Sequence, residues 1–172
     1  MPSSLKKLIR DIPDFPKPGI LFKDITPLLA DPSGLSLAVE LMANPWRDDR
    51  PDLVVGTESR GFIFGTAIAQ SLSCGFVPVR KPGKLPAKTI SVKYELEYGS
   101  DEVQMHADAV KPGQRVLMVD DLIATGGTMK AACELVTSVG GNILGVAVLI
   151  ELDALGGREL IDPVMVHSLL RY

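Results

Sequence analysis

The sequence contains no long apolar run and few cysteines. No stretch approaches the roughly 20 apolar residues that a membrane span requires, and the N-terminal segment lacks the apolar core of a signal peptide. Cys74 and Cys133 both fall in apolar helical patterns, which favours buried, reduced thiols over a disulfide. We therefore expect a cytoplasmic protein that has no membrane partner.

The sequence also lacks a basic excess, an internal repeat and a low-complexity linker. Its formal net charge of −3 and its pI near 5.4 argue against a general nucleic-acid binder, although a local basic cluster could still serve an anionic small molecule. With 172 residues, 46% of them hydrophobic, the chain can bury a substantial core. We expect one domain over residues 1–172 and no nucleic-acid partner.

The most informative segment is residues 116–128, where an apolar run meets two acids and a turn of small residues. Val116–Val119 predicts a strand covered on both faces of a parallel sheet, and ligands of such sheets bind at the carboxyl ends of the strands. The amides of the small-residue turn can close around a phosphate, helped by the positive end of the following helix. That turn consists of Ala124, Thr125, Gly126, Gly127 and Thr128.

Asp120 and Asp121 stand between the strand and the turn, and they do not suit the phosphate itself. Two carboxylates would repel a polyanion, so they must face hydroxyl groups or a metal ion. A helix start that is merely capped is the alternative, but capping needs one such side chain and not two acids plus two glycines. The segment therefore predicts a site for a phosphorylated sugar.

These thirteen positions resemble the diphosphate-sugar signature of the type I phosphoribosyltransferases. The resemblance implies an α/β fold: a central, mainly parallel sheet flanked by helices, with a small N-terminal hood (about residues 1–30) and a flexible flap (about residues 81–105). It also implies that Asp120 and Asp121 bind the ribose 2′ and 3′ hydroxyls of phosphoribosyl diphosphate. The turn at 124–128 would wrap the 5′-phosphate of the same molecule.

Hydrophobic periodicity predicts alternating strands and helices along the rest of the chain. Apolar residues at 5, 8 and 9 mark a short helix, and an irregular segment with three prolines follows it. Asp31 before Pro32 predicts a helix start, and Pro45 ends that helix. The other expected elements are strands at 52–56, 76–80, 90–98, 143–150 and 164–170 and helices at 62–74 and 127–139. The strict apolar–polar alternation of residues 90–98 places that strand outside the central sheet.

At residues 56–62 a second expected strand ends and a helix follows, with Arg60 near the start of that helix. A positive group near a helix N-terminus is unfavourable by about 0.3–1 kcal/mol, so Arg60 predicts a bound anion, with an exposed surface arginine as the alternative. In the family this turn is the diphosphate loop, which implies that Glu58 and Ser59 take part in binding. The resemblance further implies a strained peptide bond between those two residues, for which the cis form is an option.

A basic loop at residues 80–88 carries Arg80, Lys81 and Lys84. A charge run is usually solvated surface, but this one follows a strand that neighbours the expected diphosphate site. We therefore predict that the three side chains neutralise the leaving diphosphate, in part from a neighbouring subunit, as in related transferases.

The acceptor is indicated by residues 15–27, where three closely spaced prolines stiffen the chain around Phe22. Such a loop can offer an aromatic face and fixed backbone groups to a purine, although a proline-rich connector with Phe22 in the core is the alternative. The segment resembles the hood of family members that act on adenine. That resemblance implies that Phe22 and Leu122 sandwich the base and that the backbones of Leu21 and Lys23 bind its edge.

Residues 94–99 extend the resemblance, which then covers positions 14–170. In the family, Glu97 lies near the imidazole ring of the purine and Tyr98 helps to shape the flap. A carboxylate there can exchange a proton with N7, so Glu97 joins Asp120, Asp121 and Arg60 as a predicted catalytic residue. On an alternating strand, however, Glu97 and Tyr98 serve different faces.

The resemblance implies transfer of the 5-phosphoribosyl group from phosphoribosyl diphosphate to N9 of adenine, giving AMP and diphosphate, by a homodimer. No histidine, cysteine or carboxylate cluster in the sequence has metal-site spacing, so Mg²⁺ should arrive bound to the substrate, with no direct protein ligand. His106, in an expected helix, and His167, in the last strand, are isolated and favour structural over catalytic positions, so neither is assigned a role.

Two alternatives stay open at this point. Phosphoribosyl-binding folds also serve as regulators that sense the sugar diphosphate and bind nucleic acid, but these usually add a domain or a basic surface. A transferase for hypoxanthine, xanthine or orotate is the second alternative, and the Phe22 segment argues against it.

Overall fold

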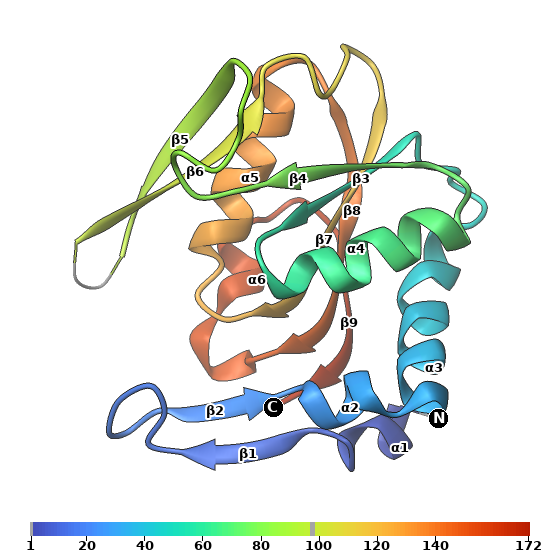
Figure 1. Ribbon diagram of the computed structural model, residues 1–172, viewed down its shortest axis with the longest axis vertical. Coiled ribbons are helices and arrows are strands. Elements are labelled where there is room, and N and C mark those ends of the chain that lie inside the picture. The colour runs from blue at the N-terminus through green and yellow to red at the C-terminus, as the bar shows by residue number, and fades with distance from the viewer. Residues whose placement is uncertain (1, 97–98) are drawn as a thin grey trace.

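A five-stranded parallel sheet forms the centre of the computed structural model, which describes residues 2–96 and 99–172 (Figure 1). The strand order is β4-β3-β7-β8-β9, and every neighbouring pair is parallel. The strands are β3 (Leu53–Thr57), β4 (Gly75–Val79), β7 (Arg115–Ile123), β8 (Asn142–Glu151) and β9 (Val166–Arg171). The longest two, β7 and β8, lie side by side, so the predicted site extends from the middle of the sheet.

Helices cover both faces of this sheet. One face packs against α3 (Pro32–Ala43) and α4 (Arg60–Ser71), and the other against α5 (Gly127–Ser138). The shorter helical segments are α1 (Pro2–Lys6), α2 (Thr26–Ala30), η1 (Asn44–Trp46), η2 (Asp153–Leu155) and α6 (Gly157–Leu160). The predicted cap of α3 is confirmed, because Asp31 accepts a hydrogen bond from the Gly34 amide at 2.6 Å.

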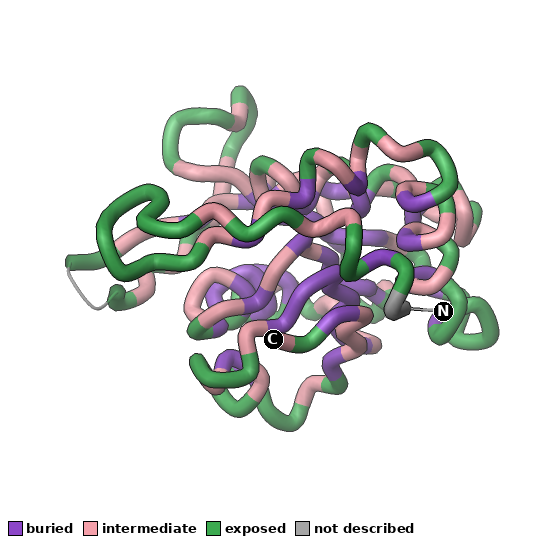
Figure 2. The backbone as a smooth tube through the Cα atoms, turned by 90° about the horizontal axis from the view of Figure 1, so that it is seen from below, coloured by how far each residue is buried: buried purple, intermediate pink, exposed green. Residues whose placement is uncertain are grey.

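The apolar runs of the strands are unbroken because both faces of the sheet are buried (Figure 2). Along β7, Val116 and Met118 pack toward α5, whereas Leu117 and Val119 pack toward α3 and α4. All four are fully buried. Burying a side chain of this size contributes about 1.5–3 kcal/mol relative to leaving it exposed. The sheet is therefore a rigid platform for the polar residues that follow Val119.

Two antiparallel hairpins stand at the side where the parallel strands end (Figure 1). One joins β1 (Arg10–Pro13) to β2 (Leu21–Asp24), and the other joins β5 (Thr89–Glu95) to β6 (Ser100–His106). The prediction that the alternating strand lies outside the central sheet is confirmed. The two hairpins border the carboxyl edge of the sheet from opposite sides.

Several sequence predictions were wrong in detail. Residues 10–30, expected to be irregular, contain β1, β2 and α2. The helix expected around His106 is instead the end of β6, where Val103 and Met105 alternate inward and are buried. Pairing with β5 supplies hydrogen bonds that a single-segment pattern could not anticipate. Cys74 lies beyond the end of α4 and is half-buried, whereas Cys133 is buried, and both are free thiols.

Across residues 2–96 and 99–172, no helix is both long and apolar enough to cross a membrane.

Candidate active site

A cavity of about 290 Å³ lies at the carboxyl edge of the sheet. It is formed by the end of β7, the turn that follows it, the loop between β3 and α4, and one residue of the basic loop. Its lining residues are Glu58, Ser59, Arg60, Lys81, Asp120, Asp121, Leu122, Ile123, Ala124, Thr125, Gly126, Gly127, Thr128 and Met129. The structure thus brings the two predicted strand-end motifs together around one space.

Asp120 and Asp121 extend β7 beyond its apolar run, because the strand continues to Ile123. Asp120 accepts hydrogen bonds from the Thr57 hydroxyl and, at 2.8 Å, from the Asp121 amide. Burial raises the pKa of Asp120 well above its ordinary value, and the neighbouring charge of Asp121 raises it further. The pKa of Asp121 is also raised by burial, although the Arg60 guanidinium opposes that shift.

Arg60 is the first residue of α4, and its Nε lies 2.9 Å from Oδ2 of Asp121. The N–H does not point at the oxygen, so the contact is an ion pair without a hydrogen bond, and Oδ2 is left buried with no hydrogen-bond partner among the described residues. The anion that offsets the unfavourable helix position of Arg60 is therefore a carboxylate of the chain itself. The peptide bond between Glu58 and Ser59, on the same loop, is cis.

The turn between β7 and α5 offers backbone groups to the cavity. Gly126 precedes the helix with φ +86°, a conformation that favours glycine, and no side chain in the described residues caps the helix at this end. The first amides of α5 therefore face the cavity together with the positive end of the helix dipole. Such an arrangement binds a phosphate without any basic side chain.

Of the three basic residues predicted to bind the diphosphate, Arg80, Lys81 and Lys84, only Lys81 lines the cavity. The Lys81 amide donates a 2.7 Å hydrogen bond to Glu58, and Nζ pairs with Asp101 of β6. Arg80 Nε lies 3.2 Å from Glu58 Oε1, but its side chain does not line the cavity. Lys84 is exposed and also lies outside it.

Phe22, on β2, is half-buried and faces the same region. Its ring lies 5.0 Å from the Arg60 guanidinium and makes an edge contact, at 5.0 Å between ring centroids, with Phe15. Leu21 is exposed, and Leu122 lines the cavity from β7. The Lys23 side chain is directed elsewhere, because its buried Nζ binds Asp11 at 2.7 Å.

Sequence reasoning missed Tyr94, whose hydroxyl lies 3.0 Å from Thr128 Oγ1. Its place in the alternating strand gave no sign of this, since the approach of β5 to α5 is a tertiary contact. It also missed Thr57 as a partner of Asp120. The predicted residues Glu97 and Tyr98 lie outside the described residues.

Neither histidine lines the cavity. His106 accepts a hydrogen bond from the Ala87 amide at 3.2 Å, and His167 Nε2 lies 3.2 Å from the Leu41 carbonyl oxygen.

Comparison with known proteins gives one consistent result. The profile of the phosphoribosyl transferase domain matches residues 26–169. The adenine phosphoribosyltransferase of Rhodopirellula baltica is 58% identical over 98% of this chain and 82% of its own, and that of Halothermothrix orenii is 56% identical over 97% and 98%. The crystal structure of the Thermoanaerobacter pseudethanolicus adenine phosphoribosyltransferase superposes with a TM-score of 0.97 at 49% identity, covering all of both chains. A Saccharomyces cerevisiae relative, solved with adenine and an imino-altritol bisphosphate, gives 0.94 at 40% identity over 98% of each chain.

Proposed function

Since the chain belongs to the phosphoribosyltransferase family, among the adenine phosphoribosyltransferases, we propose that it transfers the 5-phosphoribosyl group from phosphoribosyl diphosphate to N9 of adenine. The products are AMP and diphosphate, so the reaction is a step of purine salvage. Residues 1–172 act as one domain, with the hood and the flap on either side of the cavity. The observation that carries the proposal is that one cavity joins a carboxylate pair to a turn of free amides.

The carboxylate pair suits the sugar. Ribose 2′ and 3′ hydroxyls are neighbouring donors, and the two adjacent carboxylates that line the cavity are matching acceptors. As the bond from C1′ to the leaving oxygen stretches, the ring becomes cation-like, and negative charge on Asp120 and Asp121 favours that state. The amides of residues 124–128 bind the 5′-phosphate and fix the ring relative to the pair.

The leaving diphosphate lies toward Glu58, Ser59 and Arg60, with Lys81 supplying positive charge from the cavity wall. Arg80 and Lys84 add positive charge for the same diphosphate from beyond the cavity wall, since neither side chain lines the cavity. Within residues 2–96 and 99–172 no group of three or more metal-ligating side chains is present. Mg²⁺ would bind with the substrate and without a direct protein ligand, and it would neutralise charge on the diphosphate.

The base binds between Phe22 and Leu122. Phe22 is on the hairpin that borders the cavity, and Leu122 belongs to the cavity wall. The backbones of Leu21 and Lys23 bind the edge of adenine, which is consistent with a Lys23 side chain that is occupied by Asp11. Glu97 exchanges a proton with N7, and Tyr98 shapes the flap.

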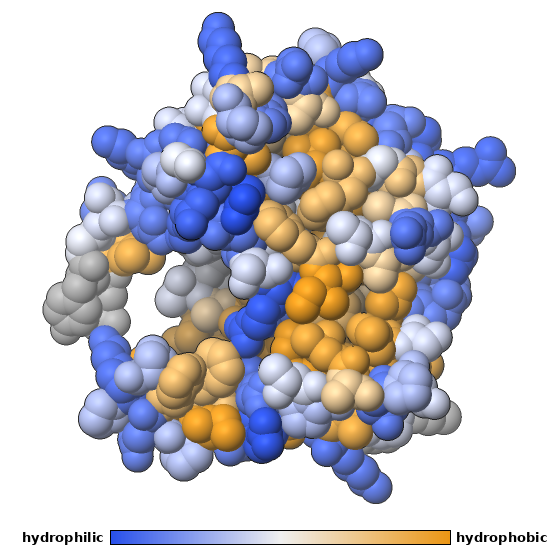
Figure 3. Space-filling model, in the orientation of Figure 1, coloured by the Kyte–Doolittle hydropathy of each residue, from blue (hydrophilic) through white to orange (hydrophobic). Residues whose placement is uncertain are grey.

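The protein acts as a cytoplasmic homodimer. Figure 3 shows apolar side chains gathered over the region of α4, where Ile63 is 40% exposed. An apolar surface of this kind, next to the helix that carries Arg60, suits a second copy of the chain that borders the active site.

A steady-state assay with phosphoribosyl diphosphate, Mg²⁺ and each of adenine, hypoxanthine, guanine and orotate tests the proposal. We expect AMP from adenine, no comparable product from the other bases, and product inhibition by AMP. A preference for another base would contradict the base assignment, and activity with none of them would favour a regulator. Omitting Mg²⁺ should abolish turnover.

A further inference from the structure

The turn at residues 124–128, which we assign to the phosphate, is in direct backbone contact with Gly157, a residue distant in the sequence. A Cβ atom added to Gly126 would lie 2.4 Å from the carbonyl oxygen of Gly157, and one added to Gly157 would lie 2.3 Å from the carbonyl oxygen of Ala124. Real Cβ contacts are essentially never this short, so the two backbones touch directly. Gly157 therefore limits how the turn can lie at this point.

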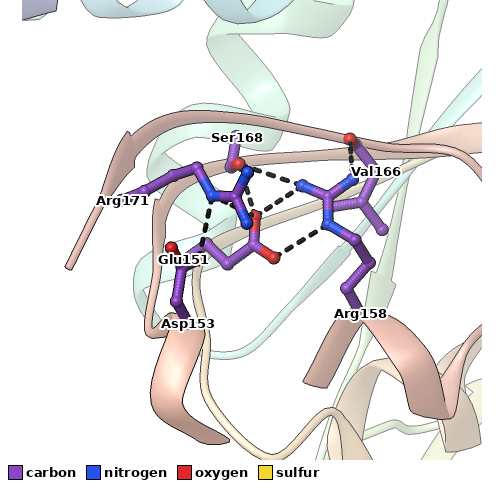
Figure 4. A network of polar contacts seen from close by, with 6 residues as sticks. All are labelled: Glu151, Asp153, Arg158, Val166, Ser168 and Arg171. Atoms are coloured by element: carbon purple, nitrogen blue, oxygen red, sulfur yellow. Dashed lines mark hydrogen bonds and ion pairs between the residues drawn. The ribbon is translucent and has the colours of Figure 1, made fainter. Parts of the chain in front are cut away.

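Gly157 opens α6, and the next residue, Arg158, ties that helix to the central sheet (Figure 4). Arg158 donates to both carboxylate oxygens of Glu151 on β8, at 2.9 and 2.5 Å. It also donates to the Val166 carbonyl oxygen at 2.7 Å and to the Ser168 hydroxyl at 3.2 Å, both on β9. The planar guanidinium thus fixes α6 in angle as well as in distance.

The partner of Arg158 is itself held firmly. Glu151 is only 3% exposed, and it accepts a further 2.5 Å hydrogen bond from Ser168. The hydrogen bonds from Arg158 lower the pKa of Glu151, and those to Glu151 raise the pKa of Arg158, so both groups stay charged at neutral pH. Next to Glu151, the Leu152 amide donates to the Ile123 carbonyl oxygen at the end of β7. The Glu151–Arg158 pair is therefore connected, through this hydrogen bond, to the strand that carries the aspartates.

We propose that the Glu151–Arg158 pair is a positioning clamp that holds Gly157 beneath residues 124–126 and so sets affinity for the phosphate end of the substrate. Neither Glu151 nor Arg158 lines the cavity, so they act through the turn and not on the reacting atoms. Phe22, in contrast, belongs to the separate β1–β2 sheet, so of the two residues assigned to the base only Leu122, on β7, is near this clamp, and the base site should be affected less than the turn. The inference rests on the proposed function, since it assigns that phosphate to the turn.

Arg171 provides a matched control. Its Nε lies 3.8 Å from Glu151 and 2.9 Å from Asp153, but Arg171 is on β9 and has no covalent tie to Gly157. Arg171→Met removes a guanidinium from the same carboxylate and leaves the clamp in place. Arg158→Met removes the clamp, and Arg158→Lys keeps the charge but loses the two-point contact.

We expect Arg158→Met to raise the KM for phosphoribosyl diphosphate about tenfold and to leave the KM for adenine within about twofold of the wild type. Arg158→Lys should be intermediate and Arg171→Met close to the wild type. Gly157→Ala disturbs the turn and leaves the side chains of the ion pair in place, so it should reproduce the same selective effect. Arg158→Lys tests the pair itself even where Arg158→Met does not fold. Equal changes in both KM values, or a normal KM for phosphoribosyl diphosphate in Gly157→Ala, would overturn the clamp.

Calorimetric titration with ribose 5-phosphate separates this inference from the proposed function. Wild-type protein should bind it, Arg171→Met should match the wild type, and Arg158→Lys and Gly157→Ala should bind it more weakly. Binding that is unchanged in Arg158→Lys and Gly157→Ala refutes the clamp alone. A wild-type protein that binds neither ribose 5-phosphate nor AMP refutes the proposed function, and the clamp with it.

Discussion

Asp120→Asn should make the protein more stable and less active. The substitution removes the ionisable group beside the carboxyl of Asp121 but keeps the local hydrogen bonds, because an amide can accept from the Asp121 amide and donate to the Thr57 hydroxyl. We expect relief of the like-charge contact to add about 1 kcal/mol to the free energy of unfolding, within the roughly 0.5–2 kcal/mol that single stabilising substitutions give. For a chain of this size, that corresponds to a rise in Tm of about 2–4 °C.

The gain should depend on pH, and its direction follows from the raised pKa of Asp120. The carboxyl ionises near its ordinary value of 3.8 in the unfolded chain but at a higher pH in the folded protein. The folded state therefore holds the proton more tightly, and the stability that this provides is lost as pH rises from about 4 through the raised pKa. Asp120→Asn should accordingly differ little in Tm from the wild type near pH 4 and exceed it at pH 7.5.

The catalytic activity of Asp120→Asn should fall although its stability rises. A hydrogen bond from a ribose hydroxyl to a charged acceptor is worth about 1.5–3 kcal/mol, which corresponds to roughly a 10- to 150-fold loss in kcat/KM. Differential scanning fluorimetry at the two pH values and steady-state kinetics with adenine provide the measurements. Asp108→Asn, at an exposed position, is the control for removing a charge. A lower Tm for Asp120→Asn at pH 7.5, or unchanged kcat/KM, would refute this account of the pair.

Four further predictions each concern a single residue. Phe22→Leu should raise the KM for adenine about 2- to 10-fold and leave that for phosphoribosyl diphosphate unchanged in the same kinetics. Lys84→Ala should weaken phosphoribosyl diphosphate far more than adenine, and equal effects on both would reject its assignment. Gly126→Ala should lower Tm and weaken AMP binding measured by calorimetry, because φ is +86° and the new Cβ would meet Gly157. Cys133, whose pKa burial raises to about 12, should resist thiol reagents at pH 8 until the protein unfolds, and modification of the folded protein would contradict its burial.

The central fold and the small-residue turn after β7 could be predicted from the sequence because their signals are contiguous. Val116–Val119, the two aspartates and the glycine-threonine turn follow one another along the chain, so strand, acids and helix start are fixed by local preference. The same holds for Asp31, which caps the helix that begins at the next residue. Local patterns failed where a segment takes its structure from a distant partner, as β6 does from β5 and β1 does from β2.

The sequence by itself determined which residues we predict to carry the chemistry, because the acid pair, the small-residue turn and the arginine at a helix start are each defined by neighbours in the chain. Only the tertiary structure decided how they meet. Arg60 reaches Asp121 across 61 positions, and Gly157 supports Gly126 across 31. Such contacts arise because adjacent parallel strands end at one edge of the sheet, and no periodicity within a single segment records which loops will be brought together there.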